Sequence, residues 1–181
     1  MGGVAIVCWG AGGVVALLLQ ALNRLTPYAI EAFELGLTPL QWAVCIAWTL
    51  LNAYAEGYRG FQKGFSPRVI ARMVHLARAP RPLFVLLAPL YAMSLFHARK
   101  KRLIVARVLV VVIVGLVLTI RYLPQPWRGI VDVGVVVGLV WGTLSILWLL
   151  FAALFRGSVP PDDSLPETES TVAVGSAQST S

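Results

Sequence analysis

Long apolar runs fill most of the chain. They form continuous blocks, without the 3.6-residue period of an amphipathic helix or the alternation of a half-buried strand. Four blocks have the length of a membrane-spanning helix, about 17–25 residues. They cover residues 3–22, 39–58, 103–120 and 130–155. A transmembrane β-barrel would alternate apolar and polar residues in short segments, which this sequence does not do. The pattern predicts an all-α fold, a polytopic membrane helix bundle within residues 1–156.

A fifth apolar block, residues 82–97, is shorter and contains Pro89. A helix of this length, at 1.5 Å per residue, covers about 24 Å and falls short of the roughly 30 Å hydrocarbon core. We therefore expect a short re-entrant or shallow helix here, and four spanning helices in all. Five spans are the alternative, because basic side chains at the two ends of the block can reach the headgroups.

The basic residues decide between these two threadings. Ten of the fifteen Lys and Arg residues lie within residues 59–102, on both sides of the short block. Five crossings divide this basic segment between the two sides of the membrane, whereas four crossings leave it all on one side. Because Lys and Arg in short loops mark the cytoplasmic side, the distribution favours four spans with both termini cytoplasmic.

A basic amphipathic helix is predicted over residues 67–78, where the pair Ser66-Pro67 is a helix start signal. Apolar residues such as Val69 and Met73 fall on one face. The opposite face carries Arg68, Arg72, His75 and Arg78. Helices of this kind lie in the headgroup plane with their cations toward anionic lipid. We expect these four basic residues to face lipid.

Two patterns within the spans concern contacts between helices. Thr38 followed by Pro39 is typical of an N-cap and first helical residue, and begins the second span. Gly134, Gly138 and Gly142 recur every four residues in the last span and therefore share one face. Small residues at this spacing let another helix approach closely, so we expect a helix-packing face.

One polar cluster is expected inside the membrane. Asn52 and Glu56 lie one turn apart near the cytoplasmic end of the second span, and Arg107 lies near the cytoplasmic end of the third. In the four-span threading the two charges share a depth, which predicts an ion pair within about 4 Å. Such a cluster serves as an ion or proton relay, as a headgroup site, or only to fix helix packing. Glu56 has Arg59 and Lys63 as alternative partners at the surface.

Composition agrees with a membrane location. Charged residues make up 13% of the chain and the mean hydropathy is +0.79, whereas a soluble domain carries about 25% charged residues. The net charge is +7, yet residues 157–181 hold four acids and no base, and we predict that they form a disordered acidic tail. We attribute the basic remainder to the cytoplasmic charge bias and to attraction toward anionic lipid, and expect no nucleic-acid partner.

The sequence offers little for chemistry. Cys8 and Cys45 lie in apolar segments, and His75 and His97 lie in basic surroundings that disfavour a cation. The sequence contains no zinc-protease, nucleophile-elbow or phosphate-loop motif. We expect no metal, no cofactor and no enzymatic activity.

Three local stretches, residues 56–61, 65–68 and 123–129, resemble segments of uncharacterised small multi-pass bacterial inner-membrane proteins. The resemblance spans roughly residues 50–140. It implies a location in the bacterial cytoplasmic membrane, and no activity is attached to it.

These observations lead to one expected function and one alternative. The chain is expected to have a structural or accessory role, docking to anionic lipid or a partner protein through its basic cytoplasmic face. The partner is either another membrane protein or a second copy of the chain. The alternative is a small transporter or channel component that uses Asn52, Glu56 and Arg107.

Overall fold

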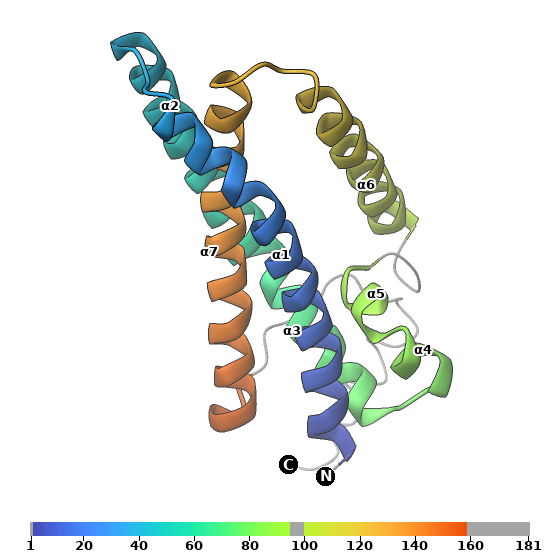
Figure 1. Cartoon of the computed structure of the whole chain (residues 1–181). Helices are drawn as coiled ribbons and strands as arrows, with labels where there is room; N and C mark the ends of the chain where they lie inside the picture. Colours follow the sequence, from blue (N-terminus) through green and yellow to red (C-terminus); the bar gives the residue numbers. More distant parts are fainter. Residues whose placement is uncertain (1, 95–99, 159–181) are drawn as a thin grey trace.

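The computed structural model describes residues 2–94 and 100–158, and every regular element within them is a helix, which confirms the all-α prediction. Figure 1 shows α1 and α7 side by side and α6 set apart from them, with the start of α1 and the end of α7 at the same end of the molecule. The elements are α1 (Gly2–Glu34), α2 (Pro39–Asn52), η1 (Ala53–Phe65), α3 (Ser66–Arg78), α4 (Pro82–Leu86), α5 (Ala88–Ala92), α6 (Lys100–Ile120) and α7 (Trp127–Arg156).

Two helices, α1 and α7, are each long and apolar enough to cross a membrane. They run antiparallel. Gly129, near the start of α7, lies against Tyr28 and Ala32, near the end of α1. Ile146, further along α7, shares a buried cluster with Val7 from the beginning of α1. α7 is slightly longer than the predicted span and ends at Gly157, whose φ of 65° is the left-handed conformation common after a helix.

α1 is much longer than its predicted span of residues 3–22. It continues through Pro27 to Glu34 without a break. A proline inside a helix removes one backbone hydrogen bond and disturbs the preceding turn. Here the Thr26 hydroxyl donates to the Leu22 carbonyl at 2.7 Å in that same turn. The predicted first connection is therefore mostly helix, and the chain reverses only after Leu35.

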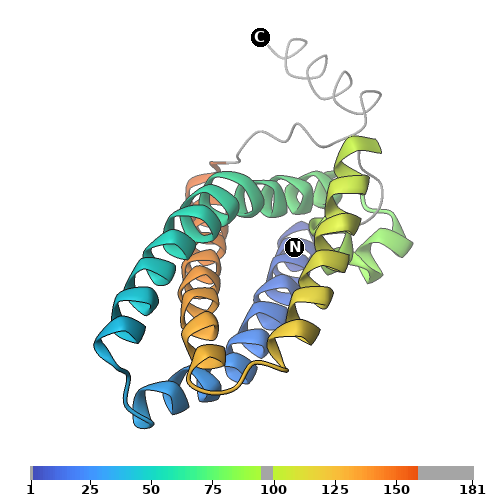
Figure 2. The same ribbon diagram turned by 90° about the horizontal axis from the view of Figure 1, so that it is seen from above.

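α2, η1 and α3 form one uninterrupted helical path, although the sequence predicted a break between residues 58 and 67. The start is as expected, since Thr38 and Gln41 form a capping box in front of Pro39. The backbone stays helical at both junctions, and η1 between them is a π-helix, whose hydrogen bonds join residues five apart. π-helical segments bend helices, and Figure 2 shows the path changing direction along this stretch.

The short apolar block is broken in two. α4 and α5 are each only five residues long, so neither is long enough to cross a membrane alone. α5 packs against α1 and α3, with Ala88 and Pro89 against Gly10 and Gly13 of α1. The last residues of the predicted block, 95–97, lie outside the described part of the chain.

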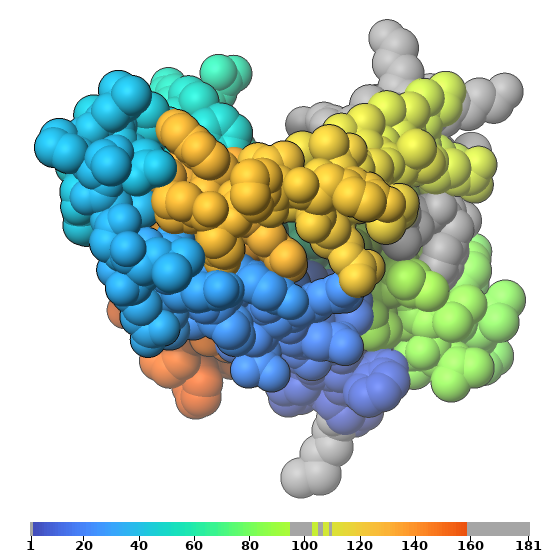
Figure 3. Space-filling view, turned by 45° about the horizontal axis from the view of Figure 1, so that its top comes forward, coloured from blue at the N-terminus to red at the C-terminus, as the bar shows by residue number. Residues whose placement is uncertain are grey.

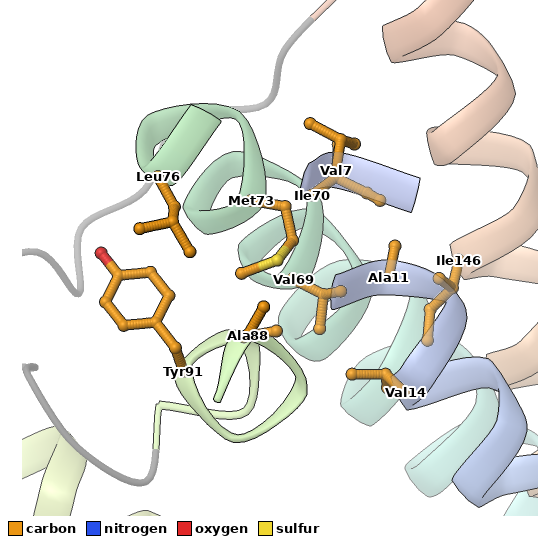
Figure 4. Close-up of a cluster of buried hydrophobic side chains, with 11 residues drawn as sticks. Val7, Ala11, Val14, Val69, Ile70, Met73, Leu76, Ala88, Tyr91 and Ile146 are labelled. Carbon is orange, nitrogen blue, oxygen red and sulfur yellow. The ribbon is translucent and has the colours of Figure 1, made fainter. Parts of the chain in front are cut away.

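The main hydrophobic core is built by the first half of α1 together with α3, α5 and α7 (Figure 4). The apolar face of α3 lies inside this core, where Val69, Ile70 and Met73 are fully buried. The amphipathic helix predicted over residues 67–78 is present, but its apolar face packs on protein instead of entering lipid. The sequence pattern could not distinguish these outcomes, because both remove the same residues from water.

α6 differs from the other long helices because it packs closely on no other described element. It lies at the surface of the molecule (Figure 3) and exposes apolar side chains along most of its length. The predicted acidic tail lies outside the described residues, except for Gly157 and Ser158.

Candidate functional site

The glycine face of α7 brings α2 and η1 unusually close. A β-carbon built on Gly134 would lie 2.6 Å from the Trp48 indole nitrogen. One built on Gly138 would lie 3.1 Å from Glu56 Oε2, and one on Gly142 would lie 2.5 Å from the Phe61 ring. At Gly134 and Gly142 these distances would force a neighbouring ring to move, whereas at Gly138 a small shift of the Glu56 side chain would be needed.

Polar groups line the same interface near its α2 end. The indole N–H of Trp48 donates across the interface to the Val131 carbonyl of α7 at 3.1 Å. Asn52 is buried and its amide donates to the Trp48 carbonyl at 2.8 Å. Glu56 follows one turn later, beside Gly138. Asn52 and Glu56 therefore share an interface, as their spacing implied.

Arg107 does not join this cluster. Among the described residues, no ion pair joins Glu56 to Arg107, and the prediction of a contact within about 4 Å is wrong. The two residues lie on helices that do not pack together, because η1 packs along α7 while α6 lies on another side of the molecule (Figure 2). The Arg107 side chain is exposed. The prediction assumed that Glu56 and Arg107 lie at the same depth in the membrane. Two residues at the same depth can still lie on opposite sides of the helix bundle.

A second polar cluster, which the sequence did not predict as a site, lies where α7 begins. Asp132 is 2% exposed, and its Oδ2 lies 3.8 Å from Nε of Arg128, one turn earlier. The Arg128 guanidinium also covers the ring of Tyr28 in α1, 3.5 Å from its centroid. The sequence signal was the four-residue spacing of opposite charges, which favours pairing on a helix.

Gln125 ties this cluster to α1. Its amide nitrogen donates to the Tyr28 carbonyl at 3.2 Å and to Glu31 Oε2 at 2.9 Å. Its amide oxygen accepts from the Gly129 N–H at 3.0 Å. The turn before α7 is thereby fixed against the far end of α1. The three hydrogen bonds of Gln125 therefore have a structural role at this end of the bundle.

The basic residues of α3 separate into different environments. Arg72 is fully buried, its Nε donates to the Tyr91 carbonyl at 2.8 Å, and its guanidinium lies 4.1 Å from the Tyr91 ring centroid. The prediction that Arg72 faces lipid is therefore wrong. Arg68 is half-buried and its Nε donates to the Gly64 carbonyl at 2.7 Å. His75 is also half-buried, whereas Arg78 is exposed.

The described residues include no group of three His, Cys, Asp or Glu side chains arranged to hold a metal ion. Cys8 is exposed and Cys45 is buried.

No family model matches this sequence, and neither the curated proteins nor the solved structures include a similar one.

Proposed function

We propose that this chain is an integral multi-pass membrane protein with a structural or accessory role, which docks to anionic lipid or a partner protein through a basic cytoplasmic face. The observation that carries the proposal is the distribution of side chains between surface and interior. Large apolar residues such as Leu50 and Val111 are 66% and 71% exposed, while Asn52, Arg72 and Asp132 are buried. Exposing this much apolar surface to water has a large free-energy cost, whereas exposing it to lipid costs little.

The interior supports the same proposal. Helices in a bilayer gain little from burying large apolar side chains against each other, so they pack through small residues and polar contacts. The contact of α7 with α2 and η1 uses Gly134, Gly138 and Gly142 in this way, together with the bond from Trp48 to the Val131 carbonyl.

The proposed threading has four crossings: α1, the path of α2 into η1, α6 and α7. The segment of α4 and α5 enters from one side and returns to it. Support comes from the length of α2 and η1 taken together, and from the common end at which α1 begins and α7 finishes (Figure 1). Charge bias assigns that end to the cytoplasm. The resemblance noted in the sequence supports a bacterial cytoplasmic membrane as the location.

The proposed docking face is at the cytoplasmic end, where Arg78 and Arg81 are exposed. Arg68 and His75 are half-buried, so only the exposed part of each side chain belongs to this face. A base near an anionic membrane surface contributes about 1 kcal/mol of attraction. Two exposed bases at this face therefore favour anionic lipid, or an acidic patch on a partner.

Cysteine labelling tests the threading. Single cysteines at Ala79, Tyr122 and Ser158, all exposed positions, are introduced into a background with Cys8 and Cys45 changed to Ser. An impermeant thiol reagent should label position 122 from outside the cell, and positions 79 and 158 only after permeabilisation. If positions 79 and 122 label from the same side, the four-span threading is wrong. Release of the protein from membranes by alkaline carbonate would contradict integral insertion.

The docking face has its own test. In nanodiscs, wild type should unfold at higher temperature when phosphatidylglycerol replaces phosphatidylcholine, since a ligand of the folded state stabilises it. The double change Arg78→Gln with Arg81→Gln should reduce this difference. Arg24→Gln with Arg121→Gln, at the other end of the bundle, should leave it unchanged. An undiminished difference in the Arg78 and Arg81 double variant would remove the basic face from the proposal.

A second candidate function, transport of a proton or small cation, is favoured by the polar line between α7 and its neighbours. Asn52 and Glu56 belong to the contact of α7 with α2 and η1, and Asp132 is buried in α7 beside Arg128. Arg107 has no part in this version. Glu56→Gln should abolish proton flux into liposomes while leaving insertion intact. Equal proton flux in wild type and Glu56→Gln would rule out this transport function.

A further inference from the structure

An open groove of about 810 Å³ runs along the outer face of α7. Most of its wall is apolar and comes from α7, including Val137, Leu144 and Trp148, and the opposite wall includes Gln62 of η1 and Pro67 of α3. The volume lies in the range of small-molecule sites, about 300–1,000 Å³. The groove exists because the helical path from η1 into α3 turns along the flank of α7 (Figure 2).

The groove is elongated along α7. Its lining begins at Val136 and ends at Leu149, which corresponds to about 20 Å at 1.5 Å per residue. That length is roughly two thirds of the hydrocarbon core of a bilayer. The indole N–H of Trp141 in α7 donates to Gln62 Oε1 of η1 at 2.7 Å, and this hydrogen bond joins the two walls of the groove.

A cation lies at one end of the groove. The guanidinium of Arg156, the last residue of α7, lies 5.7 Å from the ring centroid of Trp148, which lines the groove. Arg156 is exposed, so its charge is available to a ligand. This is the end of α7 that the proposed threading assigns to the cytoplasmic headgroups. An apolar channel that ends at a cation at headgroup depth complements a molecule with an apolar chain and an anionic head.

We propose that this groove binds one anionic phospholipid, with an acyl chain along α7 from Trp148 toward Val137 and its phosphate on Arg156. The site rests on the proposed membrane function, because the groove opens sideways and a lipid enters it only from a bilayer. A guanidinium binds phosphate through two parallel N–H donors, which a zwitterionic headgroup weakens by adding its own cation. The site should therefore prefer phosphatidylglycerol to phosphatidylcholine.

Brominated lipids test the site, because bromine on an acyl chain quenches tryptophan fluorescence on contact. The full-length protein is placed in phosphatidylcholine nanodiscs that contain a small fraction of brominated phosphatidylglycerol or brominated phosphatidylcholine. We expect phosphatidylglycerol to quench at a mole fraction on the order of tenfold lower, which corresponds to about 1.4 kcal/mol. Changing Trp141 and Trp148 to Phe should remove this selective part of the quenching.

Arg156→Gln should make the two brominated lipids quench alike, and Arg121→Gln, an exposed arginine at the other end of the bundle, should preserve the preference. Each variant is first checked for folding by the protection of buried Cys45. Should Arg156→Gln fail to fold, the preference of wild type is measured in rising salt, which must weaken it because salt screens exposed charges.

The outcomes separate the two proposals. Equal quenching of wild type by both brominated lipids, or a full preference in Arg156→Gln or at high salt, would overturn the lipid site while leaving membrane insertion standing. Absence of quenching by either lipid at any mole fraction would contradict membrane insertion itself.

Discussion

The guanidinium of Arg72 lies over the ring of Tyr91, 4.1 Å from its centroid, while its Nε donates to the Tyr91 backbone carbonyl at 2.8 Å. These two contacts join α3 to α5, beside the core that includes Tyr91 (Figure 4). They help to hold α5, a five-residue helix too short to be stable alone. A buried charge is tolerated here because it bonds a carbonyl and covers an aromatic face.

Arg72→Gln should therefore lower the free energy of unfolding by about 2 kcal/mol, since it removes a charge-assisted hydrogen bond and the contact with the aromatic ring. Arg78→Gln, an exposed arginine on the same helix, should change it by less than about 0.5 kcal/mol. Heating in detergent with a thiol dye measures this. Cys45 is 3% exposed and becomes reactive on unfolding, in a background with Cys8 changed to Ser. Equal stability of the two variants would contradict a structural role for Arg72.

Gly134→Ala should destabilise the protein by about 1–3 kcal/mol, because the new methyl group overlaps the Trp48 indole and must displace it from the Val131 carbonyl. The matched control is Gly115→Ala in α6, where nothing lies within 4 Å of the added carbon. That change should stabilise by up to about 1 kcal/mol, as alanine favours helix. Melting curves in detergent give the sign of each effect. If both variants lose stability equally, the close contact at Gly134 does not explain the effect.

Gln125→Ala should lower stability by about 1–3 kcal/mol, because it removes the hydrogen bonds that hold the start of α7 against Tyr28 and Glu31 of α1. Gln20→Ala removes an exposed glutamine from α1 and should be nearly neutral. Chemical unfolding of the two variants in mixed micelles compares them directly. The interpretation fails if the Gln125 and Gln20 variants unfold at the same midpoint.

Glu56 and Arg107 should be energetically independent, because their helices do not pack on each other. In a double-mutant cycle, Glu56→Gln and Arg107→Leu should have additive effects on stability, within about 0.5 kcal/mol. A buried ion pair would instead make the single changes cost more than the double change. A coupling of about 2 kcal/mol would restore the pair and contradict the arrangement of α6.

Several features of this protein follow from the sequence alone. The four long apolar blocks predicted helices, and the structure has helical residues at each of the four places. Thr38 with Pro39 predicted the start of α2. The spacing of Gly134, Gly138 and Gly142 placed them on one face, which is buried. These features are local: they depend on backbone propensity, capping and helical period, which act within a few residues.

Only the tertiary structure decided what each face meets. The apolar stripe of α3 predicts removal from water, and lipid or protein satisfies it equally, so the core position of Met73 could not be predicted. The burial of Arg72 depends on Tyr91, which lies 19 residues further along the chain. Glu56 and Arg107 have a compatible depth and charge, yet the position of α6 around the bundle separates them. Helix period fixes a residue's face, whereas the partner of that face is chosen by packing among all the helices at once.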